Sequence, residues 1–184
     1  MIKETMNTFI KIFIMISLLY LTKGEILYNN TTSISRRIRQ PREEMSYAEF
    51  KNNAVLVHGG KNAIAEASFI YSDPARDCVL VTLYCKLEHT GGIAHITIDQ
   101  NPEIELNLLF EKFLDANKNI TIIDLEARII GGKAGLSETT ASTIIDVLNA
   151  NNILIIENDT LTDSPRTIVL DTQYDGKVFD VINF

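Results

Sequence analysis

The chain has 184 residues, of which 46% are hydrophobic and 22% charged, and its formal net charge is -7. This length and apolar content fit one folded domain with short extensions, and they exclude a disordered or collagen-like chain. The acidic balance argues against nucleic-acid binding, because neutralising phosphates requires a basic face. The charge is uneven, since residues 1–61 carry a net +4 and residues 62–184 a net -11.

An apolar run near the N-terminus predicts an export signal. It covers residues 9–21, which is shorter than the roughly 20 residues of a membrane span, and small residues ending at Gly24 offer a cleavage point. We therefore expect residues 1–24 to be a signal peptide, a secreted or periplasmic protein, and no membrane span after cleavage. Because Lys11 interrupts the run, an N-terminal anchor or a buried helix is the alternative.

A basic leader is expected to follow the signal. Residues 25–53 are mostly polar at their start and include four arginines, at positions 36, 37, 39 and 42. A solvated, flexible segment is the usual state of such a composition. The folded domain is therefore expected to cover residues 54–184.

The first half of that domain reads mainly as strands. The patterns predict, in chain order, strands at 54–57, 63–71, 78–85 and 93–98, with Gly59–Gly60 after the first and Gly91–Gly92 before the last. An amphipathic helix is expected at 104–117, where apolar residues recur at helical spacing.

The second half alternates strands with one more helix. In chain order, it predicts a strand at 120–130, a helix at 137–149 capped by Ser137, a strand at 153–156, and a hairpin of 166–172 with 177–181 around Asp175–Gly176. The sum is an α+β fold in which mixed β-sheets are layered with two helices.

The two cysteines, Cys78 and Cys85, lie in one predicted strand. Seven residues of strand span about 23 Å, whereas bridged Cα atoms lie within about 7 Å of one another. A disulfide between them is therefore not expected. Their odd spacing also sends the two side chains to opposite faces of the sheet.

Several short motifs follow one another along the chain in a characteristic order. They are Val57–Lys61 (VHGGK), Ser72 six residues before Cys78, the apolar residues 79–81, Gly91–His95 (GGIAH) seventeen residues beyond the cysteine, Glu126–Gly132, Ile153–Asp159, Arg166–Asp171 and Asp175–Val178. In order and spacing, residues 55–184 resemble the CheD family of chemoreceptor glutamine deamidases, whose catalytic fold is shared with the cytotoxic necrotizing factor toxins.

The resemblance implies a CheD-like fold and a protein-glutamine deamidase, a hydrolase that converts Gln to Glu and releases ammonia. In that scheme Cys78 is the nucleophile, His95 the base, and Ser72 the group that orients His95. The implied partner is a protein with an exposed Gln, and no metal or organic cofactor is expected. Export favours a secreted, toxin-like enzyme over a chemotaxis role; the sequence assigns no substrate protein or oligomeric state.

Strand spacing alone raises an objection to the Cys78–His95 pair. If 78–85 and 93–98 formed a simple hairpin around a loop at 87–92, Tyr84 would oppose His95 and Cys78 would lie about 20 Å away. The pair then requires a different arrangement of the strands. Cys85 with His95 is the competing pair, although strand parity disfavours it in that register.

The segment before Cys78 departs from the family pattern. Family members have Leu-Gly-x-Gly-Ser there, whereas this chain has Asp73–Asp77 (DPARD). Pro74 lacks an amide donor, and Asp77 places a negative charge beside the thiol. One alternative is therefore a catalytically inactive CheD-like binding module. The other is a cytoplasmic chemoreceptor deamidase, which applies if residues 9–21 are not a signal.

Overall fold

The computed structural model describes residues 42–162 and 164–182. The expected signal peptide, 1–24, and the leader up to residue 41 lie outside the described residues. The described part contains two five-stranded mixed sheets and three α-helices, two of which are long. The predicted α+β class with mixed sheets and two main helices is therefore confirmed.

One sheet carries the central strands of the fold. Its order is β3 (Lys61–Glu66), β6 (Thr90–Ile96), β5 (Val79–Cys85), β7 (Leu125–Gly131) and β8 (Leu154–Thr160). Neighbouring strands are antiparallel except β7 and β8, which are parallel and connected through helix α4 (Glu138–Ala150). A helical crossover is the usual connection of two parallel neighbours.

The second sheet combines the two ends of the described chain. Its order is β1 (Glu44–Ser46), β10 (Lys177–Ile182), β9 (Ile168–Asp171), β4 (Phe69–Ser72) and β2 (Ala54–Val57). β9 and β10 form the hairpin predicted around Asp175–Gly176. β2 and β4 are parallel, so they end at the same edge of the sheet.

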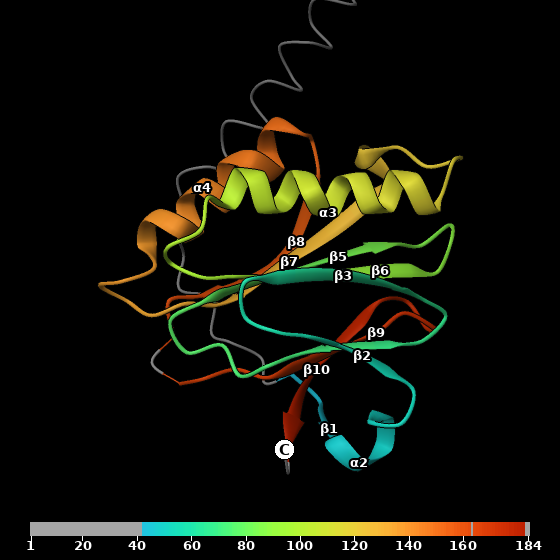
Figure 1. Cartoon of the computed structure of the whole chain (residues 1–184), viewed down its shortest axis with the longest axis horizontal. Coiled ribbons are helices and arrows are strands. Elements are labelled where there is room, and N and C mark those ends of the chain that lie inside the picture. Colours follow the sequence, from blue (N-terminus) through green and yellow to red (C-terminus); the bar gives the residue numbers. More distant parts are fainter. Residues whose placement is uncertain (1–41, 163, 183–184) are drawn as a thin grey trace, which may run out of the picture. The chain divides into compact units, whose positions relative to one another are not determined.

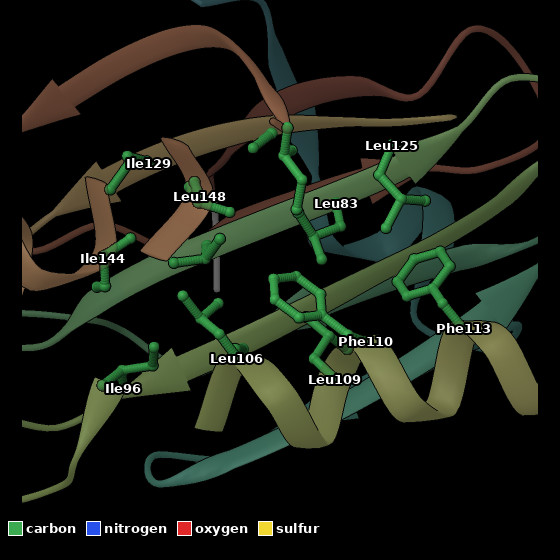
Figure 2. Close-up of a cluster of buried hydrophobic side chains, with 14 of the residues drawn as sticks. Leu83, Ile96, Leu106, Leu109, Phe110, Phe113, Leu125, Ile129, Ile144 and Leu148 are labelled. Carbon is green, nitrogen blue, oxygen red and sulfur yellow. The ribbon is translucent and has the colours of Figure 1, made fainter. Parts of the chain in front are cut away.

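The elements form layers with three apolar clusters (Figure 1). Helices α3 (Pro102–Ala116) and α4 cover one face of the β3-β6-β5-β7-β8 sheet, and Figure 2 shows the apolar side chains packed there, among them Leu83, Ile96 and Phe110. Leu80 and Ile93, from the opposite face, pack against the second sheet. The third cluster includes Phe50 from the short helix α2 (Tyr47–Phe50).

Helix α3 begins two residues earlier than its apolar pattern indicates. The Asn101 side chain accepts hydrogen bonds from the backbone N–H groups of Glu103 and Ile104, and Pro102 occupies the first helical position. Both features satisfy or remove donors that a helix start leaves unpaired. The acidic residues Glu103 and Glu105 lie in the first turn, where the helix dipole favours negative charge.

Two expected strands are divided in the structure. Residues 63–71 were expected to form one strand, but β3 and β4 belong to different sheets and are separated by Ala67, whose φ is 44°. A left-handed backbone ends an extended run because side chains rarely adopt it. Residues 120–130 were also expected as one strand, but a 3-10 turn, η1 (Ile122–Asp124), precedes β7.

The largest correction concerns the glycines of β6. Gly91 and Gly92 were expected to join two strands, but both lie inside β6, and only residues 86–89 form the turn. A Cβ at Gly91 would lie 2.5 Å from Cγ2 of Thr172, and one at Gly92 would lie 2.8 Å from Cε2 of Phe113. These glycines therefore permit β6 to pack closely against β9 on one side and α3 on the other.

The end of the expected leader is part of the folded domain. Residues 42–53 include β1 and α2, and the Arg42 side chain, 6% exposed, pairs with three carboxylates. Its Nη2 lies 2.7 Å from Glu157 and 2.8 Å from Asp159, and its Nη1 lies 3.2 Å from Asp180. Arg42 thus connects the start of β1 to β8 of one sheet and β10 of the other.

Replacing Gly91 with Ala tests the close packing of β6. We expect Gly91→Ala to lower the free energy of unfolding by about 1–3 kcal/mol, because the added methyl group overlaps Thr172 and Leu170. Urea unfolding measures the change. In the matched control, Gly59→Ala, the nearest atoms lie 4.0 Å away, so we expect a change within about 1 kcal/mol. Equal stability of Gly91→Ala and wild type would contradict this packing.

Candidate functional site

The register of β5 and β6 sets the relative positions of Cys78 and His95. Leu80 opposes His95 and Val79 opposes Ile96, where the ladder ends. Continuing this register by one residue places Cys78, the residue before β5, opposite Thr97, the residue after β6. Cys78 and His95 are then diagonal neighbours on one face, whose Cα atoms lie roughly 7–8 Å apart in antiparallel pairs. The objection drawn from a pairing of Tyr84 with His95 is wrong, because β6 begins at Thr90.

The competing pair is not formed. Cys85 opposes Thr90, five residues from His95, and its side chain is 0% exposed in the cluster between the sheet and the helices. Cys78 packs instead against the cluster between the two sheets and is half-buried. Both cysteines are free, as expected, and they lie on opposite faces.

Ser72 faces the same layer but has another partner. It ends β4, is 0% exposed, and its Oγ accepts a long hydrogen bond, 3.5 Å, from the backbone N–H of Ile168. Both ring nitrogens of His95 are without a hydrogen-bond partner in the described structure. The hydroxyl of Ser72 therefore makes no hydrogen bond to His95 in this conformation.

A histidine–aspartate pair borders His95. Because Val57 opposes Ser72 in the parallel β2–β4 pair, the next residues, His58 and Asp73, come side by side. Nδ1 of His58 lies 2.7 Å from Oδ2 of Asp73. Sequence reasoning missed this pair, although a parallel pairing of the strands before the two residues would have indicated it.

The turn after β2 covers His95. The backbone N–H of Gly60 donates to the carbonyl of His95 at 2.8 Å, and a Cβ at Gly59 would lie 4.0 Å from Cε1 and Nε2 of the His95 ring. His95 is 2% exposed as a result. Lys61, the first residue of β3, opposes His95 directly and is exposed at the rim.

The backbone around Cys78 is fixed by the second glycine turn. The N–H of Gly132 donates to the carbonyl of Cys78 at 2.7 Å, and a Cβ at Gly131 would lie 3.1 Å from that carbonyl oxygen. Ser137, at the start of α4, does not cap the helix with its side chain; its Oγ donates to the carbonyl of Asp77 at 2.6 Å. Ser137, expected as a helix cap, thus holds the backbone of the residue before Cys78.

Burial and charge keep both reacting groups neutral. Burial raises the pKa of the Cys78 thiol, and the carboxylates of Asp77 and Asp99 raise it further. Burial lowers the pKa of His95, while the charge of Asp73 and the backbone of Val57 act in the opposite direction. Both shifts favour the uncharged forms, a thiol at Cys78 and a neutral imidazole at His95.

The described residues hold no group of three or more His, Cys, Asp or Glu side chains placed to bind a metal ion. Within the same residues, no helix is both long and apolar enough to cross a membrane.

Comparisons with known proteins leave the family open. The sequence matches no protein-family model and no curated protein. A crystal structure described as Bacillus licheniformis hypothetical protein YfiH aligns at 13% identity with a TM-score of 0.40, over 54% of this chain and 49% of that chain. The chain thus spans about half the length of that protein, and so distant a likeness assigns neither family nor function.

Thiol labelling tests the unequal environments of the two cysteines. We expect a maleimide to modify Cys78 in the native protein, faster as the pH rises, because its raised pKa leaves little thiolate at neutral pH. Cys85 should react only after unfolding, because it is fully buried. Mass spectrometry of digested protein locates the label, and Cys78→Ser is the control. Native labelling of Cys85 ahead of Cys78 would contradict the arrangement.

Proposed function

We propose that the domain is a cysteine hydrolase that deamidates protein glutamine side chains. The observation that carries the proposal is the register of β5 and β6, which makes Cys78 and His95 diagonal neighbours facing one layer. A thiol beside an unpaired imidazole is the arrangement that nucleophilic catalysis on an amide requires. The resemblance of the sequence motifs to the CheD family indicates the substrate, the side-chain amide of a Gln on a protein surface.

The reaction follows from these two groups. His95 takes the thiol proton as the sulfur of Cys78 attacks the side-chain carbonyl carbon of Gln. The tetrahedral intermediate then expels ammonia, with the proton returned by His95, and a thioester remains on Cys78. Water activated by the same imidazole hydrolyses the thioester, which leaves Glu and restores the thiol.

Two adjacent residues, Ser72 and Asp73, share the role of orienting and supporting His95. Ser72 is the expected orienting group, and its buried hydroxyl faces the layer that contains His95. The charge of Asp73 partly offsets the lowering of the His95 pKa by burial, and Nδ1 of His58 contacts the Asp73 carboxylate. We propose that Ser72 contacts His95 only when substrate is bound, and that Asp73 supports the imidazolium formed during reaction.

The location of the enzyme, outside or inside the cell, is proposed from the sequence alone. The apolar run at 9–21 supports an exported, toxin-like enzyme that acts on an external protein. Without signal function, the same domain would act as a cytoplasmic chemoreceptor deamidase.

A non-catalytic binding module is the second candidate function. It is favoured by the raised pKa of Cys78, because catalytic thiols commonly have lowered values. Protein binding without ammonia release would identify this alternative.

Ammonia release from peptides with one Gln each tests the proposed function. We expect Cys78→Ala to abolish release and His95→Ala to slow it by roughly 10²–10⁴-fold, the usual contribution of a general base. Because burial lowers the pKa of His95, the acid limb of the pH profile should lie below the ordinary histidine value of about 6.5.

The matched control is Cys85→Ala, which removes the second thiol, located outside the site. This variant should leave the rate of ammonia release per folded molecule nearly unchanged. Circular dichroism verifies that each variant is folded. Release that persists in folded Cys78→Ala protein would overturn the assignment of the nucleophile.

A further inference from the structure

We infer that the target glutamine of the substrate is flanked by a positively charged side chain, which pairs with the carboxylates of Asp77 and Asp99 beside Cys78. This inference rests on the proposed function, and it adds the class of substrate, a basic protein segment. The inference is based on two carboxylates near Cys78, that of Asp77 directly before it in the chain and that of Asp99 after the neighbouring strand β6.

Asp77 has an unused carboxylate oxygen next to the nucleophile. Its backbone carbonyl is held by Ser137, whereas its Oδ1 is buried and has no hydrogen-bond partner in the described structure. A buried carboxylate oxygen without a donor costs free energy unless a ligand supplies one. The position directly before Cys78 means that a donor bound there lies beside the reacting group.

Asp99 acts on Cys78 from the other strand. It follows β6 two residues after Thr97, which occupies the position opposite Cys78. Oγ1 of Thr97 donates to Oδ1 of Asp99 at 2.5 Å, and this hydrogen bond lowers the pKa of Asp99. Asp99 therefore stays ionised and presents a fixed negative charge near the thiol.

His95 gives an independent indication that a polar ligand belongs here. It is 2% exposed, and neither ring nitrogen makes a hydrogen bond of ordinary geometry among the described residues, although the backbone of Val57 lies close enough to act on the pKa of the ring. A buried imidazole with both nitrogens unpaired is rare in folded proteins. One unpaired group, the acceptor on Asp77, belongs to the residue directly before Cys78, and the other, the ring of His95, belongs to the strand that pairs with β5.

Among residues 42–162 and 164–182, no cation forms an ion pair with these carboxylates. Arg76 precedes Asp77, Lys133 follows the glycine that donates to the Cys78 carbonyl, and Lys61 lies opposite His95. None of these three cations forms an ion pair within the described structure. The remaining charged group, Asp73, pairs with His58 and adds negative charge. A cation from the substrate fits this local field, and the net -11 of residues 62–184 would steer it there.

Binding and activation are coupled in this arrangement. Asp77 and Asp99 raise the pKa of the Cys78 thiol in the free protein. A bound Lys or Arg side chain offsets their charge, so the pKa falls and the thiol gives up its proton more readily. A substrate without the cation meets a less reactive thiol and binds less well.

Matched peptides test the inference through their relative rates. Acetylated, amidated peptides of one length carry a single Gln flanked by Lys, Ala or Glu, and ammonia release gives kcat/KM for each. We expect the Lys-flanked peptide to exceed the Glu-flanked one by at least about tenfold at low salt, with the ratio reduced at high salt. Asp77→Asn and Asp99→Asn should each reduce this ratio severalfold, whereas Asp146→Asn, on the exposed face of α4, should not change it.

A second readout does not depend on turnover. The alkylation rate of Cys78 at pH 7 should rise severalfold in Asp77→Asn, because the substitution removes a negative charge. In the wild-type protein the same rate should rise on addition of trilysine, which offsets the negative charge, but not on addition of triglutamate. Equal kcat/KM for Lys- and Glu-flanked peptides would overturn the inference and leave the deamidase proposal standing. If no peptide releases ammonia, the proposed function fails, and alkylation unaffected by trilysine then overturns the inference as well.

Discussion

The pairing of Leu80 with His95 is the constraint on which the site depends. A shift of one residue in this register would send His95 to the helical side of the sheet, because side chains alternate between faces. The observed pairing is fixed by the short turn at 86–89 and by apolar residues on both faces of β5. The proposed position of Cys78 beside His95 therefore follows from the packing of the core.

Glycines allow the neighbouring layers to approach this pair. Gly91 and Gly92 leave room for side chains of β9 and α3, and Gly131 and Gly132 let the end of β7 approach the backbone of Cys78. Both of the latter have positive φ, 86° and 75°, which side chains rarely adopt. These two glycine pairs therefore have different structural roles: Gly91–Gly92 lies within β6, and Gly131–Gly132 lies where β7 ends.

Much of the fold could be predicted from local pattern. The apolar spacing predicted the two long helices within two residues at each end, the Asp175–Gly176 signal predicted the final hairpin, and strand parity placed Cys78 and Cys85 on opposite faces. The register could not be predicted, because Gly91 and Gly92 resemble a turn when the layers that pack on them are unknown. The His58–Asp73 pair was missed for a similar reason, since β2 and β4 pair across an intervening strand of the other sheet.

The proximity of Cys78 and His95 is the central claim, and a titration tests it most directly. Cys78 is alkylated with iodoacetate, which adds a carboxylate, or with iodoacetamide, which adds a neutral group of similar size, and the three histidines are titrated by NMR. We predict that the carboxymethyl group raises the pKa of His95 relative to the neutral adduct, whereas His89, bonded to Tyr84 at the other end of the β5–β6 hairpin, does not respond. Identical titration of His95 in the two adducts would contradict the account.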